Sequence, residues 1–250
     1  MNNFIITTNV KTSQHLIDTA NNLAKKFGVK VVPRQKKTIK ELITCYEKIL
    51  VVYKDKYVYY EKDVKLFFHP DTAMFRIKNN NDVLCEILKD CTSVFDATLG
   101  LGRDSIVLSY NDKKVVACES SEIIYFITST GLKNYKTENE KLNSAMKKIT
   151  CYKENSLDFL KKMPDNSFDA VYFDPMFQEN IKESENLTAL KKVADNNYLT
   201  TELLDQAKRV AKKKIVLKAH FKDSTFEKFN FWRRVRENTK FHYGIIDLEK

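Results

Sequence analysis

Two glycines stand close together in a chain that has only five among 250 residues. Gly100 and Gly102 lie within the segment DATLGLGRD, Asp96 to Asp104, directly after a short apolar run. Glycines that follow a buried strand permit a tight turn and let a ligand approach the main chain, while the next helix offers its first amide groups. The third glycine of a dinucleotide fingerprint is absent, so the spacing predicts a ligand-holding turn without identifying the ligand.

An acidic residue follows the next apolar run. Glu119 stands 17 residues after Gly102, directly after the apolar run of residues 115–118. Where a glycine turn follows the first strand of a nucleotide-binding sheet, a carboxylate at the end of the second strand can accept hydrogen bonds from both ribose hydroxyls of a nucleoside. An acid at a strand end is also commonly just solvated, but the distance from the glycine turn favours a nucleoside ligand.

Two later segments carry polar residues at the same kind of position. Asn155 and Ser156 follow the run at 149–152, where they could contact a base edge or simply cap the next helix. Asp174, Pro175 and Phe177 follow the run at 170–173, within DPMF. An acid, a rigid proline and an aromatic ring therefore emerge together, and an ordinary turn is the less favoured interpretation.

The apolar runs predict the element that positions these residues. From residue 82 onward, helical patterns alternate with short apolar runs at 94–97, 115–118, 149–152, 170–173 and 215–218. Such runs are typical of parallel strands covered on both faces, so we expect a doubly wound α/β sheet, mostly parallel. Residues 231–237 and 241–248 are expected to close it as an antiparallel hairpin. The carboxyl ends of the parallel strands would bring the polar segments to one edge.

The N-terminal residues have a different hydrophobic pattern from the rest of the chain. We therefore expect a smaller α/β region over residues 1–80, ahead of a main domain over 81–250. We expect strands at 4–7 and 29–33, a helix at 13–27 capped by Thr12 and ended by Gly28, and a hairpin over 48–68. The first 90 residues hold 16 basic and 10 acidic side chains. This excess is mildly suggestive of a substrate-facing surface.

Composition limits the class of protein. Lysine and arginine number 43 against 33 acidic residues, giving a net charge of +10, which suits a polyanionic partner but can also reflect a lysine-rich composition. No apolar run is long enough for a membrane span and the first residues lack a signal-peptide pattern, so we expect a cytoplasmic protein without a membrane partner. Five cysteines without a C-x-x-C pair and scattered histidines predict neither disulfides nor a metal site.

The glycine turn, Glu119 and the DPMF segment together resemble the class I S-adenosylmethionine methyltransferases. More closely, they resemble the branch that contains the bacterial 16S ribosomal RNA guanine-N2 methyltransferases, over about residues 75–250. The resemblance implies a Rossmann-like fold, S-adenosylmethionine as the cofactor and RNA as the partner. The residues it implies for cofactor binding are Asp96, Gly100, Gly102, Arg103, Asp104, Glu119, Ser120, Asn155, Ser156 and Asp174. The chain departs from the family at Gln178, where proline is usual, and at Lys218-Ala219-His220, where a basic residue and proline are expected.

The chemistry of that reaction suits these residues. An exocyclic base amine is a poor nucleophile because its lone pair is delocalised, and acceptors on its two N–H groups localise that pair. We hypothesise that the Asp174 side chain and the Pro175 carbonyl are those acceptors and that Phe177 stacks on the base. The residues expected to hold the substrate are Arg76, Lys218, Arg234 and Arg236. Arg76 could instead pair with an acid, and Arg234 and Arg236 could protect an edge strand.

Three other functions are compatible with parts of the pattern. A methyltransferase of this type could modify another amine of RNA or DNA, or a protein side chain. A nucleoside-binding module without catalysis would keep Glu119 and the glycine turn but would not need the DPMF segment. A dinucleotide-dependent oxidoreductase is disfavoured by the glycine spacing.

Overall fold

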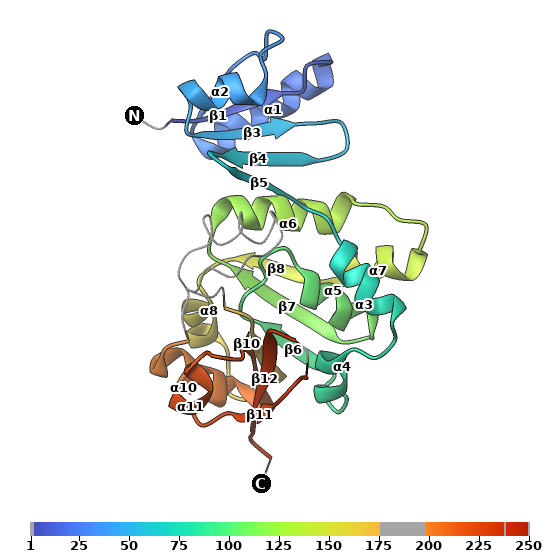
Figure 1. Ribbon diagram of the computed structural model, residues 1–250, viewed down its shortest axis with the longest axis vertical. Coiled ribbons are helices and arrows are strands. Elements are labelled where there is room, and N and C mark those ends of the chain that lie inside the picture. The colour runs from blue at the N-terminus through green and yellow to red at the C-terminus, as the bar shows by residue number, and fades with distance from the viewer. Residues whose placement is uncertain (1–2, 176–198, 238, 250) are drawn as a thin grey trace. The chain divides into compact units, whose positions relative to one another are not determined.

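A computed structural model describes residues 3–175, 199–237 and 239–249 of the chain (Figure 1). It divides into two compact units, the first containing the described residues up to 69 and the second those from 70 onward. The sequence placed this boundary at residue 80. Residues 70–80 group with the second unit because helix α3 (Asp71–Lys78) packs against helix α5 (Arg103–Tyr110). None of the helices in the described segments is long and apolar enough to cross a membrane.

The first unit, as far as it is described, is a mixed sheet with strand order β2-β1-β3-β4-β5, packed against helices. Strand β1 is parallel to β2 and β3, whereas β3, β4 and β5 form an antiparallel meander that contains the expected hairpin. Its elements are β1 (Phe4–Thr8), α1 (Gln14–Phe27), β2 (Lys30–Val31), α2 (Ile39–Cys45), β3 (Lys48–Val52), β4 (Tyr57–Glu61) and β5 (Val64–Phe67).

Local signals set the helix ends of this unit. Ser13, rather than the expected Thr12, caps α1 by accepting a hydrogen bond from the Leu16 amide. Gly28 ends the helix as expected, at a φ of 63° that favours glycine. Helix α2 begins with a capping box in which Thr38 and Glu41 satisfy each other's main-chain amides. These caps orient the helices so that apolar side chains cover the sheet.

The second unit is built on a sheet with strand order β11-β12-β10-β9-β6-β7-β8 (Figure 1). Strands β8, β7, β6, β9 and β10 are parallel neighbours, and β12 and β11 add an antiparallel hairpin, which confirms the predicted fold class. The elements are α3, α4 (Val83–Ile87), β6 (Ser93–Asp96), α5, β7 (Lys114–Glu119), α6 (Glu122–Asn134), α7 (Glu140–Lys148), β8 (Thr150–Lys153), α8 (Ser156–Lys162), β9 (Phe168–Phe173), α10 (Thr201–Val210), β10 (Ala211–His220), α11 (Thr225–Lys228), β11 (Trp232–Arg234) and β12 (Phe241–Asp247).

The strand order reverses direction at the centre of the sheet. The chain runs outward from β6 through β7 to β8 and then crosses to β9 on the other side of β6. Ligands of open α/β sheets bind where the order reverses in this way, between the ends of the two diverging strands. Here those ends are Asp96 of β6 and Asp174, which directly follows β9.

The opposite, amino-terminal ends of β6 and β9 are fixed to each other by one carboxylate. Asp169 accepts hydrogen bonds from the Thr92 amide at 2.8 Å, the Thr92 hydroxyl at 2.6 Å and the Ser93 amide at 3.0 Å. The Ser93 hydroxyl in turn accepts from the Asp169 amide. These bonds hold the pKa of Asp169 below its usual range against the effect of burial. The two central strands are thereby kept in register beneath the site.

Candidate functional site

The glycine turn is held from below by a buried carboxylate. Asp96, at the end of β6, accepts hydrogen bonds from the Ser105 hydroxyl at 2.6 Å and from the Thr98 amide at 3.0 Å. Burial raises the pKa of Asp96 to about 6, although both hydrogen bonds oppose the increase. Gly102 begins α5 at a φ of 72°, and a Cβ there would lie 3.3 Å from Thr128 Cγ2. The turn therefore requires glycine for both its conformation and its space.

Glu119 closes the same turn from the next strand. Its Oε2 accepts a hydrogen bond from the Gly100 amide at 3.1 Å, and its Oε1 accepts from the Ser121 amide at 2.9 Å. The Gly100 carbonyl accepts from the Thr128 hydroxyl at 2.7 Å. Each carboxylate oxygen has more than one lone pair, so both can accept further hydrogen bonds while the two amides keep the group in place. Ser120 lies half-buried between the two contacts.

Asn155 and Ser156 form the neighbouring wall. The Asn155 side chain accepts a hydrogen bond from the Leu157 amide at 2.9 Å, so the capping role considered from the sequence is the observed one. The buried Ser156 hydroxyl donates to the carbonyl of Ala97, which follows β6. The start of α8 is thus fixed against the glycine turn.

Asp174 lies on the other side of the turn. Its amide donates to the Thr98 hydroxyl at 2.7 Å, and its Oδ2 accepts from the Lys218 ammonium at 2.6 Å. Lys218 also donates to Asp104 at 3.1 Å, and Asp104 accepts a further hydrogen bond from Arg76. The carboxyl ends of β9 and β10 and the first turn of α5 therefore meet in one charged cluster.

The pKa values of the two carboxylates of this cluster are shifted in opposite directions. Burial raises the pKa of Asp174 to about 7, with Lys218 opposing the rise and Asp104 adding to it. Burial acts on Asp104 in the same sense, but Lys218 and Arg76 together hold its pKa well below its usual range. Asp104 is therefore ionised throughout the neutral range, whereas Asp174 changes charge within it.

Two buried polar atoms near Asp174 have no hydrogen-bond partner among the described residues, namely Arg103 Nε and the Tyr172 hydroxyl. Arg103 directly follows Gly102 at the start of α5, and its charge interacts with Asp104 and Asp174. Buried polar groups are almost always satisfied in native proteins, so the guanidinium of the half-buried Arg103 is a candidate contact for a ligand, whereas the Tyr172 side chain is fully buried.

The remaining predicted residues lie in different surroundings. Arg234 pairs with Glu86 at 2.7 Å, and the Arg236 guanidinium lies 5.8 Å from the centre of the Tyr243 ring. Strand β11 ends at Arg234, so Arg236 lies beyond the strand that was expected over residues 231–237. Arg76 and Lys218 are paired with acids. Phe177 lies outside the described residues.

Sequence reasoning missed several residues that shape the site. Thr98 and Ser105 stand within or beside the glycine motif, where hydroxyls next to a buried strand-end acid are a usable signal. Thr128 and Tyr172 gave no such signal, because their partners are distant in sequence or absent from the described residues.

Comparison with known proteins bears on this arrangement. A family model described as putative SAM-dependent methyltransferase, SAM being S-adenosylmethionine, matches residues 22–230. The uncharacterized protein YpiP of Bacillus subtilis (strain 168) is 36% identical over 97% of this chain and 98% of its own length. A ribosomal RNA small subunit methyltransferase J of Buchnera aphidicola is 32% identical over 63% of this chain and 67% of its own length. The crystal structure of a SAM-dependent methyltransferase from Neisseria gonorrhoeae has the same fold, with a TM-score of 0.64, 17% identity and coverage of 97% and 95%.

Proposed function

The chain belongs to the SAM-dependent methyltransferase family, and we propose that it methylates small-subunit ribosomal RNA at the N2 amine of a guanine. The RNA substrate is supported by the name of the Buchnera relative and by the net charge of +10. The observation that carries the reaction is the position of Asp174, an acceptor beside the glycine turn at the switch point of the sheet.

The residues present suit S-adenosylmethionine, the cofactor of this family. Glu119 is fixed by two amides, and its carboxylate would accept hydrogen bonds from the ribose hydroxyls. The unpartnered Arg103 Nε and the first amides of α5 suit the carboxylate of the methionine portion. Ser120, Asn155 and Ser156, which follow β7 and β8, would line the adenosine side of the cofactor. When bound, this cofactor supplies an electrophilic methyl group for direct displacement.

The acceptors for the base lie on the opposite side of the turn. In its ionised form Asp174 accepts one N–H of the exocyclic amine, and the Pro175 carbonyl accepts the other. Accepting both hydrogens localises the nitrogen lone pair as the new bond forms, and Asp174 takes up the proton that leaves. Phe177 supplies the stacking surface for the base. The sequence contains no obvious nucleophile pattern, and this chemistry needs none, because no covalent intermediate with the protein forms.

An aromatic and basic strip along the edge of the sheet suits the remaining RNA. Trp232 is 66% exposed on β11, next to Arg233 and Arg234, and Arg236 follows the strand. Exposed aromatic rings stack on unpaired bases, and arginines bind phosphates. We assign phosphate contacts to Arg234 and Arg236. Arg76 and Lys218 act on the substrate indirectly, through the carboxylates with which they form ion pairs.

Methyl incorporation tests the proposal directly. The full chain is incubated with methyl-labelled S-adenosylmethionine and either stripped small-subunit RNA or assembled small subunits, and the RNA is digested to nucleosides for mass spectrometry. We expect label in N2-methylguanosine with the wild type and a large loss with Asp174→Asn. Asp165→Asn is the matched control, because this exposed residue precedes the other end of β9.

Label in a different nucleoside would reject the guanine assignment but keep RNA as the substrate. Label in protein and none in RNA would reject both. Wild-type turnover by Asp174→Asn would reject the role of that carboxylate.

A further inference from the structure

Five charged side chains of alternating sign form a row of contacts from the start of α4 to the site. In order they are Asp82, Arg76, Asp104, Lys218 and Asp174. Arg76 donates to Asp82 at 2.7 and 3.1 Å, and Lys218 lies 3.1 Å from Asp104 and 2.6 Å from Asp174. Because each inner member has a partner on both sides, moving one displaces its neighbours. We call these five residues the ion chain.

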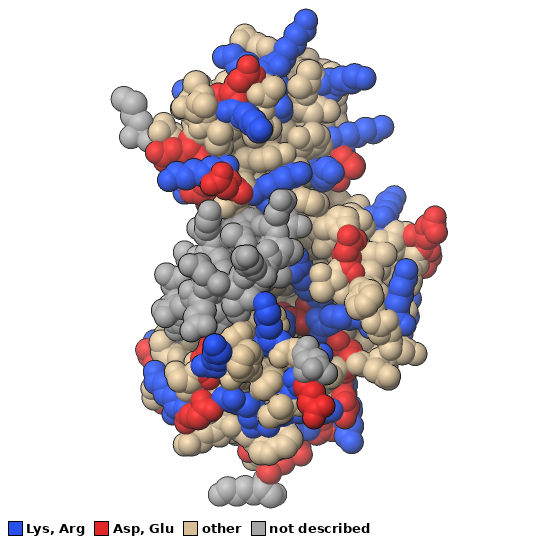
Figure 2. Space-filling model, viewed as in Figure 1, with Lys and Arg blue, Asp and Glu red and all other residues tan. Residues whose placement is uncertain are grey.

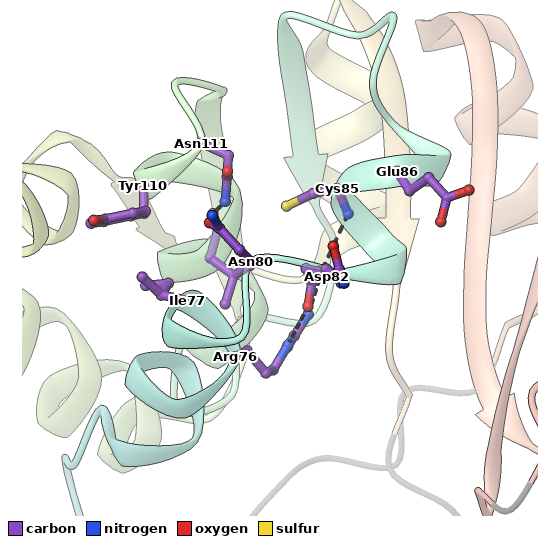
Figure 3. A pocket seen from close by; sticks show the side chains of 10 residues that line it. Arg76, Ile77, Asn80, Asp82, Cys85, Glu86, Tyr110 and Asn111 are labelled. Carbon is purple, nitrogen blue, oxygen red and sulfur yellow. Dashed lines mark hydrogen bonds and ion pairs between the residues drawn. The ribbon is translucent and has the colours of Figure 1, made fainter.

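The outer end of the ion chain is anchored by main-chain contacts. Asp82 caps α4 by accepting hydrogen bonds from the Leu84 and Cys85 amides at 3.1 Å. Figure 3 shows Arg76 and Asp82 facing each other in the wall of a cavity of about 390 Å³ between α3, α4 and α5. Because main-chain amides hold the Asp82 carboxylate in place, it would not move with Arg76 if the Arg76 side chain were changed.

The members of the ion chain are shielded from solvent. The side chain of Asp104 is only 8% exposed, and that of Lys218 is 20% exposed. Charges at hydrogen-bond distance interact more strongly away from water. Each ion pair therefore influences the position of the next charged side chain in the row. An exposed salt bridge would have no comparable effect.

We propose that Arg76 and Asp104 are positioning residues, which hold the Lys218 ammonium against Asp174 and keep that carboxylate fixed as an acceptor for the substrate amine. The inference rests on the proposed role of Asp174. Asp82 anchors Arg76. The contacts that fix the position of the acceptor therefore extend from the N-terminus of α4 through α3 and α5 to β10.

The charged groups that face Asp174 determine the direction in which its pKa should move in each variant. Lys218 and Asp104 act on it most strongly, and Arg103 and Tyr172 also interact with it. Beyond these, Asp96 and Tyr243 interact with Asp104 and Lys218. Removing the charge of Arg76 leaves Asp104 uncompensated and draws Lys218 toward it, so the pKa of Asp174 rises. Removing the charge of Asp104 takes away a repelling neighbour, so the pKa of Asp174 falls.

Carboxyl-carbon NMR titration of the full chain without ligands measures this effect independently of turnover. The Asp174 signal is assigned by its loss in Asp174→Asn. We expect Arg76→Met to raise its titration midpoint by about one pH unit, Arg76→Lys to raise it less, and Asp104→Asn to lower it. Lys214→Met is the matched control, because Lys214 lies on the same strand but pairs with Asp90 at the far edge, so its loss should leave the midpoint unchanged.

The acid limb of the pH dependence of kcat on RNA should move with the NMR midpoint in each variant. A merely structural role for Arg76 and Asp104 would lower the plateau of activity and leave the limb in place. Unchanged midpoints, or midpoints that move in the same direction in Arg76→Met and Asp104→Asn, would overturn the proposal.

Two further results separate the possible failures. Lysine cannot bridge two carboxylates as the arginine fork does, so Arg76→Lys decides the question if Arg76→Met does not fold. Its midpoint must still rise, and a wild-type midpoint would reject the proposal. If the midpoints move as expected while Asp174→Asn keeps full turnover, the proposed function of Asp174 fails and with it the positioning role, although the electrostatic coupling stands.

Discussion

At the scale of single residues, two aspartates with the same chemistry serve different purposes because of their neighbours. Asp104 is hydrogen-bonded to two cations and remains ionised, whereas Asp174 is hydrogen-bonded to Lys218 and has a carboxylate nearby, and burial raises its pKa to about 7. A site that needs one permanent anchor and one acceptor that can also take up a proton is well served by such a pair.

The pH dependence of turnover follows from the raised pKa of Asp174. In the proposed mechanism only the ionised carboxylate of Asp174 can take up the proton of the substrate amine, so activity should increase as the pH rises through about 7. Because ionisation is one-tenth complete one unit below the pKa, we expect about a tenfold increase in kcat between pH 6 and pH 8. Single-turnover measurements with saturating cofactor and RNA test this. A flat profile would show that this ionisation does not limit the reaction.

Asp174→Asn should separate catalysis from cofactor binding. The amide keeps the size of the side chain but loses the charge that accepts the amine hydrogen, so we expect turnover to fall by about a hundredfold or more. Affinity for S-adenosylhomocysteine, measured by calorimetry, should change little. An equal loss of binding and turnover would place Asp174 in the cofactor pocket rather than beside the base.

Glu119 should show the converse behaviour. Glu119→Gln keeps the size of the side chain but leaves one acceptor oxygen for two main-chain amides and the ribose, so S-adenosylhomocysteine should bind about tenfold or more weakly. Glu122→Gln, in the first turn of α6, is the matched control. Equal affinities for the two variants would exclude a ribose contact at Glu119.

At the scale of elements, the C-terminal hairpin depends on one position without a side chain. Gly244 of β12 lies so close to α11 that an added Cβ would be 2.7 Å from Phe226 Cδ1 and 2.8 Å from Phe231 Cβ. The same strand pairs with β10, which carries Lys218, so its packing bears on the site.

Gly244→Ala should therefore destabilise the second unit. The backbone or the two rings must shift to admit the methyl group, and we expect a loss of about 1 to 3 kcal/mol in the free energy of unfolding. Urea denaturation followed by the fluorescence of Trp232, the only tryptophan and a residue paired with Ile245, measures this. Gly28→Ala is the comparison, since nothing lies within 4 Å of its added Cβ and only its φ of 63° is unfavourable; because Gly28 belongs to the first unit, its unfolding is followed by circular dichroism. A Gly244→Ala loss no larger than that of Gly28→Ala would contradict the packing argument.

The elements that sequence predicted well are those specified by local pattern. Four of the five parallel strands of the second unit were visible as mostly buried apolar runs, whereas β8 is largely exposed, and Gly28 marked a helix end because its φ favours glycine. The ion chain was not predictable, since Arg76 and Asp104 are 28 residues apart and Lys218 is much farther along the chain. Strand β11 proved shorter than its pattern because it pairs with β12 only over Trp232–Arg234. Contacts between distant segments leave no periodic signal.

At the scale of the whole molecule, charge is distributed unevenly between the units. Residues 1–69 contain thirteen basic and six acidic side chains, a larger excess than the rest of the chain carries. Figure 2 shows lysines and arginines projecting from the visible face of the first unit. A positive surface of this kind binds the phosphate backbone without regard to sequence.

RNA binding by the full chain should therefore weaken steeply with salt and depend on the first unit. Replacing the exposed Lys36, Lys37 and Lys40 by glutamine should reduce affinity for small-subunit RNA and the salt slope by up to about three. The matched control removes Lys147, Lys148 and Lys208, which are exposed on the second unit. Fluorescence anisotropy from 50 to 300 mM salt compares the two. Equal losses in both variants would mean that total charge, rather than the first unit, governs binding.

The alternating arrangement of the ion chain also constrains how this protein can diverge. Replacing one inner member leaves a neighbouring charge shielded from water without its partner, so a single substitution there is destabilising. Replacing two adjacent members of opposite charge by neutral residues leaves the remaining charges balanced. Mutational drift at Arg76, Asp104 and Lys218 should thus occur in concert. Homologous sequences that lack Arg76 should have changed Asp104 or acquired another cation nearby, and an alignment in which the three positions vary independently would argue against such epistasis.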